Sequence, residues 1–298
     1  MSWVYRLWIP KGYDTEVAFC EGFVTKLMAE STNVGAKKIA WVHIDLKYNP
    51  WPQKLGIFKN VAEETNAYSH YDRIVTVSKT VEKSFNEVYY GLADSVQTIY
   101  NPIDHEDIID KSRVSIAGFE QGNEETLNII SVGRLVPQKG YDILLRVASR
   151  LKDEGFKFKL RILGEGEQRC ELEKYLKSNH LEDVVSLLGF QKNPYPYIAN
   201  SDLFVCSSRS EGYSLVIAES LVLGVPVVST YCSGPNELLK EGEYGMLVEN
   251  DESGVGLYEG IKRLMEDKNV LSESKNGAVL RGGILGGDGI LVEIAKIL

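Results

Sequence analysis

Two glutamates eight residues apart, Glu211 and Glu219, mark the part of the sequence with the clearest chemistry. The apolar run 203–206 before them is typical of a buried strand, and the apolar spacing after Ser214 predicts a helix. Glu211 then lies at the carboxyl end of a strand, where open α/β sheets bind ligands. The free amides of such a helix N-terminus suit an anion. If all eight residues are helical, about 12 Å separates the two carboxylates, enough to flank a sugar, a diphosphate and a ribose in a row.

Two cations share a second loop, which contains Arg134 and Lys139. The loop follows the apolar run 127–132, which predicts another strand, and Gly133 permits a tight turn between the two. Arginine offers a planar fork and lysine a point charge, and both suit diphosphate oxygens. Taken alone, two solvated surface cations are the ordinary interpretation. Their place in the chain relative to the two glutamates favours a binding role.

At these residues the sequence resembles the retaining glycosyltransferases of family 4, which have the two-domain GT-B fold. The resemblance rests on the motifs at 131–141 and 210–220 and on the flanking segments 200–205 and 224–237, and it covers roughly Tyr13 to Asp267. It implies an α/β protein with two Rossmann-like domains facing across a cleft. It also implies transfer of a sugar, with retention, from a nucleotide-diphosphate donor to an acceptor hydroxyl, without a bound metal or other cofactor.

The resemblance assigns roles to individual residues. Arg134 and Lys139 stabilise the leaving diphosphate, Glu211 holds the sugar hydroxyls, and Glu219 holds the ribose hydroxyls. His43, at the end of a first-domain strand, faces the transferred sugar, although a lone histidine at a strand end is more often structural. The predicted catalytic residues are His43, Glu211, Arg134 and Lys139. The predicted donor-binding residues are Gly133, Arg134, Lys139, Gly164, Phe190, Gln191, Glu211, Gly212, Tyr213, Ser214, Leu215 and Glu219.

Strands alternate with helices along most of the chain, which predicts a largely parallel sheet in each domain. We expect a first Rossmann-like domain over 1–103 that lacks the family's opening units and glycine-rich loop, a linker region over 104–126, and a nucleotide-sugar-binding domain over 127–270. The remaining segment, 271–298, is dense in glycine, which costs a helix about 1 kcal/mol per residue relative to alanine. We therefore expect no long helix there. Without that helix and the glycine-rich loop, we expect the chain to transfer sugar slowly.

Composition limits the partners. The chain is 44% hydrophobic and 25% charged, the balance of a soluble globular protein, and its net charge of -9 argues against nucleic acid as the main partner. The four cysteines form no C-x-x-C pair, which is typical of buried thiols in a reducing cytoplasm, and the four histidines lack metal-binding spacing. No apolar run approaches the roughly 20 residues of a membrane span. The expected location is the cytoplasm, and any membrane contact is expected to be peripheral, at its inner face.

The resemblance implies a hexosyltransferase-type enzyme, and its match across Tyr13 to Asp45 is most similar to bacterial enzymes of capsule or lipopolysaccharide synthesis. The expected donor is a UDP-linked sugar, and the expected acceptor a saccharide or a lipid-linked saccharide. The alternative is a non-catalytic fragment or partner subunit that binds nucleotide sugars. The unmatched glycine-rich loop favours the alternative, whereas the intact set of two cations and two glutamates disfavours it. The sequence leaves the sugar, the base, the acceptor and the oligomeric state open.

Overall fold

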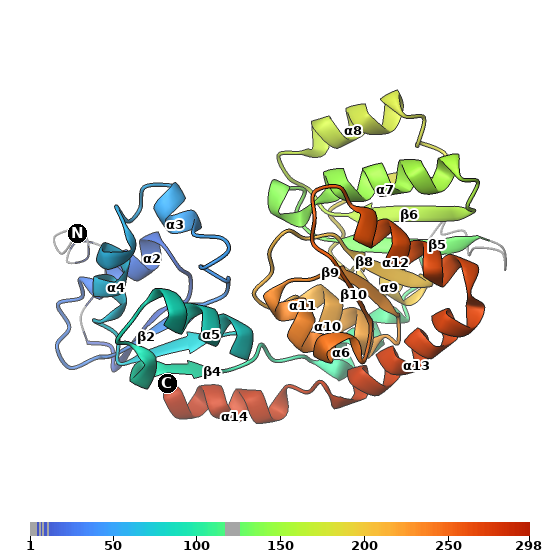
Figure 1. Cartoon of the computed structure of the whole chain (residues 1–298). Helices are drawn as coiled ribbons and strands as arrows, with labels where there is room; N and C mark the ends of the chain where they lie inside the picture. Colours follow the sequence, from blue (N-terminus) through green and yellow to red (C-terminus); the bar gives the residue numbers. More distant parts are fainter. Residues whose placement is uncertain (1–4, 6, 8, 11, 117–125) are drawn as a thin grey trace. The chain divides into compact units, whose positions relative to one another are not determined.

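The structure, a computed structural model, describes residues 1–298 with the exception of 1–4, 6, 8, 11 and 117–125. Its contacts divide the chain into two units (Figure 1). Unit 1 consists of Met1–Asn101, Ser210–Tyr213 and Asp288–Leu298. Unit 2 consists of Pro102–Arg209 and Ser214–Gly287. Each unit is an α/β unit with a parallel sheet of its own, as predicted.

Unit 1 contains a four-stranded sheet in the order β1-β2-β3-β4. Its strands are β1 (Thr15–Ala18), β2 (Lys37–Val42), β3 (Arg73–Thr76) and β4 (Val96–Thr98). The elements between them are α2 (Phe23–Ala29), α3 (Trp51–Lys54), α4 (Val61–Tyr68), α5 (Lys79–Val88) and the 3₁₀ turn η1 (Ala93–Ser95). The last four residues of β2 are all buried, which explains its continuous apolar run, because helices cover both faces of such a sheet.

The last helix, α14 (Asp288–Ile297), belongs to unit 1, far along the chain from its strands. Ile290, Ile294 and Ile297 follow helical spacing and form one face. This face packs against a buried cluster that includes Ile39 and Val75. The C-terminal segment therefore supplies part of the hydrophobic core of unit 1.

Unit 2 contains a six-stranded parallel sheet in the order β10-β9-β8-β5-β6-β7. Its strands are β5 (Leu127–Val132), β6 (Phe158–Leu163), β7 (Val185–Gly189), β8 (Leu203–Cys206), β9 (Val227–Thr230) and β10 (Met246–Val248). Its helices and 3₁₀ turns are α6 (His105–Ser112), η2 (Pro137–Lys139), α7 (Tyr141–Asp153), α8 (Arg169–Ser178), α9 (Tyr195–Ala199), α10 (Leu215–Val222), α11 (Ser233–Leu238), η3 (Lys240–Gly242), α12 (Val255–Glu266) and α13 (Lys268–Ile284). Buried side chains of α7 and α12 pack with those of β5, β6 and β8 in one core.

The strand order of unit 2 locates the expected ligand site. From the central strand β5 the chain moves outward through β6 and β7 on one side, and then returns to β8 on the other. The topological switch point therefore lies between β5 and β8. Open parallel sheets bind ligands outside the carboxyl ends of the strands at this point.

Part of the predicted linker region, 104–126, is helical. Asp104 caps α6 by accepting a backbone hydrogen bond at 3.0 Å, and Ile108 is the only buried residue among the eight of this helix. A helix with one buried side chain shows little apolar periodicity, which is why the sequence pattern did not reveal it. The rest of the predicted linker region includes 117–125, which lie outside the described residues.

The expectation that 271–298 forms no long helix is wrong, because α13 and α14 occupy most of it. Gly282 of α13 lies against α10, and a Cβ atom at this position would be 2.1 Å from the carbonyl oxygen of Leu221. Close packing of the two helices thus requires glycine, and this packing offsets its weak helix propensity. In the part of the chain that the structure describes, we find no helix with the length and apolar character needed to cross a membrane.

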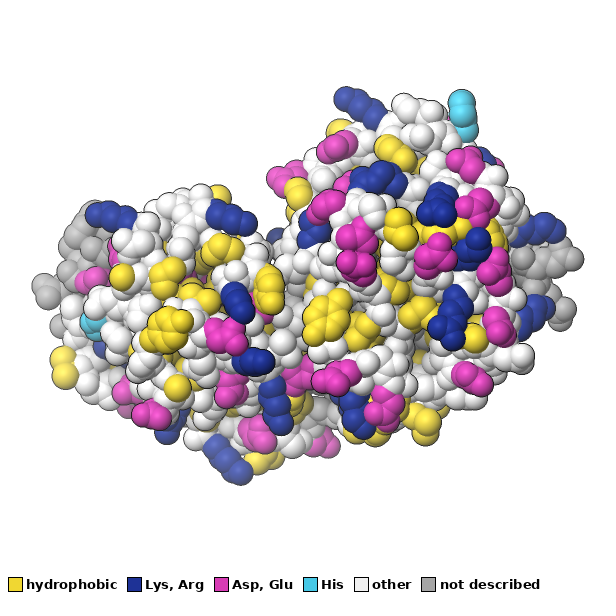
Figure 2. Space-filling model, in the orientation of Figure 1, with side chains coloured by type: hydrophobic (Ala, Val, Ile, Leu, Met, Phe, Trp, Pro, Cys, Tyr) yellow, Lys and Arg dark blue, Asp and Glu magenta, His cyan; other side chains and the backbone are white. Residues whose placement is uncertain are grey.

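Acidic and basic side chains are interspersed on the face of the molecule shown in Figure 2. They occur in this way over the visible surface of both units. The distribution accords with the net charge of -9 and differs from the concentrated basic patch of a typical nucleic-acid-binding protein.

Candidate functional site

The loops after β5, β6 and β7 lie side by side at the carboxyl edge of the unit 2 sheet. The amide of Gly133 donates to the carbonyl of Leu163 at 2.9 Å, and the amide of Gly164 donates to that of Gly189 at 2.8 Å. These bonds continue the strand pairing into the loops. Two of the residues predicted to bind a donor, Gly133 and Gly164, are therefore neighbours.

The two predicted cations occupy the loop after β5, at the switch point. Arg134 is exposed, and Lys139 is half-buried at the end of η2. Leu135 between them is fully buried, and its amide donates to the carbonyl of Glu165 at 2.9 Å. The loop is therefore anchored at its centre while both cations lie at the ligand edge of the sheet.

The N-terminus of α10 follows β8 on the other side of the switch point. Ser214 is the N-cap residue, but its side chain makes no capping hydrogen bond. Its Oγ is buried without a hydrogen-bond partner among the described residues. The amides of the first helical turn, which begins at the half-exposed Leu215, have no acceptor within the helix. An uncapped helix N-terminus of this kind attracts anions.

Glu219 lies in the second turn of α10 and is half-buried. The Tyr195 hydroxyl, from the start of α9, donates to its Oε1 at 3.3 Å. Burial raises the pKa of Glu219, and the hydrogen bond from Tyr195 opposes this effect. Burial and the nearby Glu219 charge raise the pKa of Tyr195 to about 12, so this phenol remains a donor at neutral pH. The sequence alone left Tyr195 open between a role at the ligand and a packing role, because aromatic residues in a proline-fixed loop often lie in the core.

Phe190 and Gln191 follow β7. The Phe190 side chain is 74% exposed, which leaves its ring open for stacking. The Gln191 side chain is used within its own loop: it donates to the carbonyl of Leu188 at 2.9 Å and accepts from the Tyr197 hydroxyl at 3.3 Å. Only the backbone of Gln191 therefore remains suited to reading the edge of a base.

In unit 1, His43 directly follows β2. Its backbone amide and that of Ile44 donate to one carboxylate oxygen of Glu21, and its ring lies edge-on to Phe19 at 4.8 Å between centroids. Burial lowers the pKa of His43, with a partial opposing effect from a hydrogen bond to the Phe19 backbone, so the imidazole is neutral at neutral pH. Its Nε2 atom is buried without a hydrogen-bond partner among the described residues.

Gly212 and Tyr213 belong to unit 1 and lie next to His43 and its core. A Cβ atom at Gly212 would be 2.0 Å from the carbonyl oxygen of His43, so the two backbones are in direct contact. The Ser78 hydroxyl donates to the carbonyl of Gly212 at 3.1 Å, and Tyr213 packs on the cluster around β2 and β3. The predicted group of His43, Gly212 and Tyr213 is thus brought together.

Glu211 is 7% exposed and lies in the loop before α10. The predicted helical separation of the two glutamates does not apply, because α10 begins only at Leu215. Three residues of chain span at most about 11 Å, so Glu211 stays within that reach of Ser214 at the helix N-terminus.

The predicted residues therefore form two groups, one in each unit. The group in unit 1 is His43, Glu211, Gly212 and Tyr213. The group in unit 2 is Gly133, Arg134, Lys139, Gly164, Phe190, Gln191, Ser214, Leu215 and Glu219. Every member of the second group lies in a loop after β5, β6 or β7, at the N-cap of α10 or in its first two turns.

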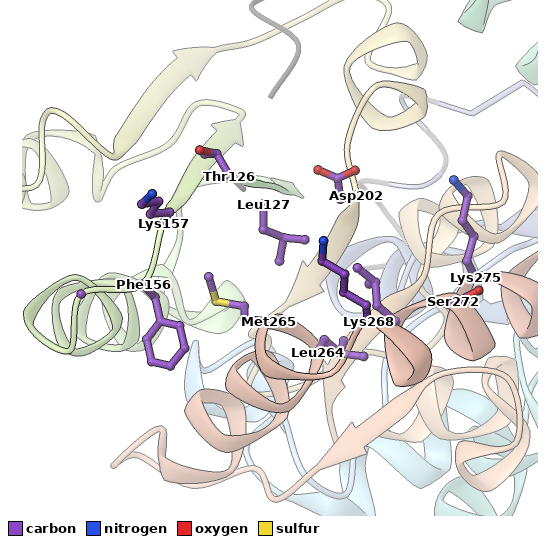
Figure 3. A pocket seen from close by; sticks show the side chains of 12 residues that line it. Thr126, Leu127, Phe156, Lys157, Asp202, Leu264, Met265, Lys268, Ser272 and Lys275 are labelled. Atoms are coloured by element: carbon purple, nitrogen blue, oxygen red, sulfur yellow. The ribbon is translucent and has the colours of Figure 1, made fainter. Parts of the chain in front are cut away.

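A cavity of about 610 Å³ in unit 2 lies elsewhere (Figure 3). It is lined by residues at the amino ends of strands, such as Leu127 of β5 and Asp202 just before β8. Figure 3 shows Leu127 between Lys157 and Lys268, which belongs to α13. The cavity is therefore at the opposite end of the strands from the predicted ligand edge and is not part of this site.

A six-stranded parallel sheet with two cations and an uncapped helix at its switch point has the features of a nucleotide-binding α/β unit. Residues 116–278, more than half of the chain, match the family described as "Glycosyl transferases group 1". The chain therefore belongs to this family.

Two curated relatives illustrate the family. The N-acetylgalactosamine-N,N'-diacetylbacillosaminyl-diphospho-undecaprenol 4-alpha-N-acetylgalactosaminyltransferase of Campylobacter jejuni is 39% identical over 186 residues, which are 62% of this chain and 48% of the relative. The lipopolysaccharide core biosynthesis glycosyltransferase LpsE of Rhizobium meliloti is 36% identical over 138 residues, which are 46% of this chain and 38% of the relative. The matches thus span about half or less of each relative's length.

Solved structures show the fold. The crystal structure of Anabaena Alr3699/HepE in complex with UDP and glucose has a TM-score of 0.77 and 20% sequence identity, and the match covers 95% of this chain and 77% of that chain. This likeness confirms the predicted α/β architecture of the GT-B glycosyltransferases with two Rossmann-like units.

Proposed function

We propose that this chain transfers a sugar from a nucleoside-diphosphate sugar, with UDP as the expected nucleotide, to a hydroxyl group of a saccharide or lipid-linked saccharide. Transfer proceeds with retention at the anomeric carbon. The observation that carries the proposal is the placement of Arg134 and Lys139 after β5 and of the uncapped α10 N-terminus after β8. Both lie at the switch point of the unit 2 sheet, where such sheets bind ligands.

The chemistry follows from the charges. When the bond between the anomeric carbon and the diphosphate breaks, negative charge grows on the leaving group and positive character grows on the sugar. Cations and helix amides held in place before the reaction stabilise the leaving group without reorganisation. In this proposal Arg134, Lys139 and the first-turn amides of α10 perform this role, and no metal or other cofactor takes part.

The other residues hold the two ends of the donor. Tyr195 occupies one oxygen of Glu219, which leaves the second oxygen for the ribose hydroxyls. The exposed ring of Phe190 stacks on the base. Glu211 binds hydroxyls of the transferred sugar. The Nε2 of His43, which has no hydrogen-bond partner among the described residues, binds the same sugar.

The comparisons support this choice of substrates. The Anabaena structure contains UDP and glucose, and the name of the Campylobacter relative includes a diphospho-undecaprenol acceptor. The name of the Rhizobium relative refers to lipopolysaccharide core biosynthesis. We propose a role in surface polysaccharide synthesis at the cytoplasmic face of the membrane on this basis.

The test measures donor turnover. Purified protein is incubated with UDP-, GDP- and ADP-linked sugars in the presence and absence of lipid-linked and free saccharides, and released nucleoside diphosphate and glycosylated product are quantified. We expect product with at least one donor and little with the Lys139→Ala variant. Nucleotide binding without release in any combination would instead support the non-catalytic alternative.

A further inference from the structure

The guanidinium of Arg209 makes five hydrogen bonds at the junction of three loops. Its Nε and Nη2 donate to the two carboxylate oxygens of Glu252, each at 2.6 Å. Its Nη1 and Nη2 donate to the two carboxylate oxygens of Asp142, each at 2.9 Å. Nη1 also donates to the carbonyl of Pro137 at 2.6 Å. Because a guanidinium has five N–H groups, Arg209 has a partner for every donor that it possesses.

The same part of the chain holds the turn η2 through three consecutive carbonyls. The carbonyl of Pro137 accepts from the Arg209 side chain, and that of Gln138 accepts from the Arg209 amide at 2.8 Å. The carbonyl of Lys139 accepts from the hydroxyl of Ser207 at 2.8 Å. Every residue of η2 is therefore bonded to the loop after β8, and Arg209 supplies two of the three bonds.

The carboxylate partners link this turn to neighbouring elements. Asp142 lies in the first turn of α7, directly after η2, and Glu252 lies between β10 and α12. Hydrogen bonds from Arg209 help to hold the pKa of each carboxyl below its usual value, against the opposing effect of partial burial. Arg146 also donates to Asp142, at 3.2 Å, so two guanidiniums balance two carboxylates. All four groups therefore stay ionised at physiological pH, and their charges sum to about zero.

These contacts distinguish positioning from direct binding. A diphosphate would gain a hydrogen bond from Arg209 only if one of its present five bonds broke. The charge of Arg209 is already compensated by carboxylates, which weakens its attraction for an anion. Lys139 sits on the turn that these bonds fix, at the ligand edge of the sheet.

We propose that Arg209 is a positioning residue that fixes the turn carrying Lys139 and thereby sets the place of the Lys139 ammonium against the donor diphosphate. The inference rests on the proposed donor-binding role of Lys139. Lysine in place of Arg209 keeps the positive charge but lacks the planar fork, so it reaches one carboxylate at a time and leaves the other bonds unmade. We therefore expect that Arg209→Lys, although it keeps the charge, no longer fixes the turn that carries Lys139.

The first experiment needs no ligand. Hydrogen exchange of backbone amides is compared between the parent chain and the Arg209→Lys variant. We expect the amides of Gln138, Lys139 and Gly140 to exchange about tenfold faster in the variant, while those of β6 keep their protection. Arg150→Lys is the matched control, because Arg150 also bonds a glutamate but lies on α7 away from η2. Unchanged exchange in 138–140 would overturn the inference whether or not the chain binds a nucleotide.

The second experiment is a double-mutant cycle with Lys139→Ala, read out as the Kd for UDP and for GDP by calorimetry. If Arg209 acts through Lys139, Arg209→Lys weakens binding by about tenfold in the parent and by less than about twofold in the Lys139→Ala background. Equal losses in both backgrounds would show that Arg209 binds the diphosphate itself, contrary to the inference. A parent chain that binds neither nucleotide contradicts the proposed function, and the exchange experiment then decides the role of Arg209.

Asp142→Asn is a milder variant for the case in which Arg209→Lys does not fold. Asparagine keeps the shape of the side chain but removes the charge and one acceptor oxygen. We expect faster amide exchange in 138–140 than in the parent chain, but slower than in Arg209→Lys. Exchange equal to that of the parent would count against the network as the source of the positioning.

Discussion

Tyr195 donates a hydrogen bond to Glu219 across 3.3 Å and so connects α9 to the second turn of α10. The contact occupies one oxygen of a carboxylate whose charge is disfavoured by burial. It therefore both orients the group that we assign to the ribose and helps to keep it ionised.

Removal of this phenol is the first prediction. Tyr195→Phe is expected to weaken binding of a nucleoside diphosphate by about three- to tenfold, less than the full value of a hydrogen bond to a charged group, because the ribose still meets the carboxylate. Calorimetric titration with UDP and GDP measures the change. Tyr258→Phe is the control, since Tyr258 also donates to a glutamate, Glu154, at a site away from the switch point. Equal effects of the two variants would contradict the assignment.

The pH dependence of Glu219 is the second prediction. Its pKa in the folded chain is raised by burial, so protons bind it more tightly in the folded than in the unfolded state. The contribution of Glu219 to folding stability is therefore fully present below the pKa that this side chain has in the unfolded chain. It is lost as the pH rises through the pKa that it has in the folded chain. Glu219→Gln should raise the Tm at pH 7 and leave it unchanged near about pH 4, where the unfolded side chain also carries a proton. A lower Tm at pH 7 would show that the charge is stabilising.

The affinity for nucleotide should fall as the pH is lowered, whereas the contribution of Glu219 to folding stability falls as the pH is raised. Protonation of Glu219 removes the charged acceptor that we assign to the ribose, so affinity for a nucleoside diphosphate should fall on acidification. The fall should begin above the ordinary glutamate pKa of 4.5. Calorimetry over this range, with Glu219→Gln as the pH-insensitive reference, tests the expectation. A parent chain whose affinity follows the same pH curve as the variant would refute it.

Substitution of Glu219 and substitution of Glu211 should affect different steps, nucleotide binding and sugar transfer respectively. Glu219→Ala is expected to weaken the binding of free nucleoside diphosphate by about ten- to a hundredfold. This range corresponds to the loss of a charged hydrogen-bond partner. Glu211→Ala should leave that affinity within about twofold and lower transfer, because the free nucleotide has no sugar to lose. Affinity and turnover are measured on the same preparations. Comparable losses of nucleotide affinity in both variants would contradict the assigned roles.

Adjacent glycines in α13 provide a test of helix packing. Gly282→Ala places a Cβ atom 2.1 Å from the Leu221 carbonyl oxygen and should lower the free energy of unfolding by about 1–3 kcal/mol. No atom lies within 4 Å of a Cβ at Gly283, so Gly283→Ala should raise that free energy by up to about 1 kcal/mol through helix propensity. Urea unfolding of both variants measures the changes. Similar shifts of the same sign would show that α13 does not pack on α10 as described.

Apolar periodicity and short motifs were enough to predict the strands, the two parallel sheets and the loops that carry Arg134 and Lys139. These features are encoded within a few residues of themselves, which is why a pattern reveals them. The helix α13 was missed for the opposite reason. Whether Gly282 breaks a helix or permits close packing depends on the Leu221 carbonyl, about sixty residues earlier in the chain.

The surroundings of the site were also beyond the sequence pattern. Tyr195 acquires its role from Glu219, and Arg209 acquires its role from Asp142 and Glu252. Neither residue stands out when it is considered alone. Their importance comes from partners that only the folded chain brings within hydrogen-bonding distance.

The packing of α14 gives unit 1 a late step in its folding. Ile290 contacts the cluster of Ile39 and Val75 across more than two hundred residues of chain. At a synthesis rate of about 5–20 residues per second, the apolar face that α14 covers emerges roughly 10–50 seconds before its cover. Unit 2 is synthesised in the meantime, so this cluster of unit 1 is covered only after the strands of unit 2 have been made. During that interval the uncovered apolar face is open to chaperones and to aggregation.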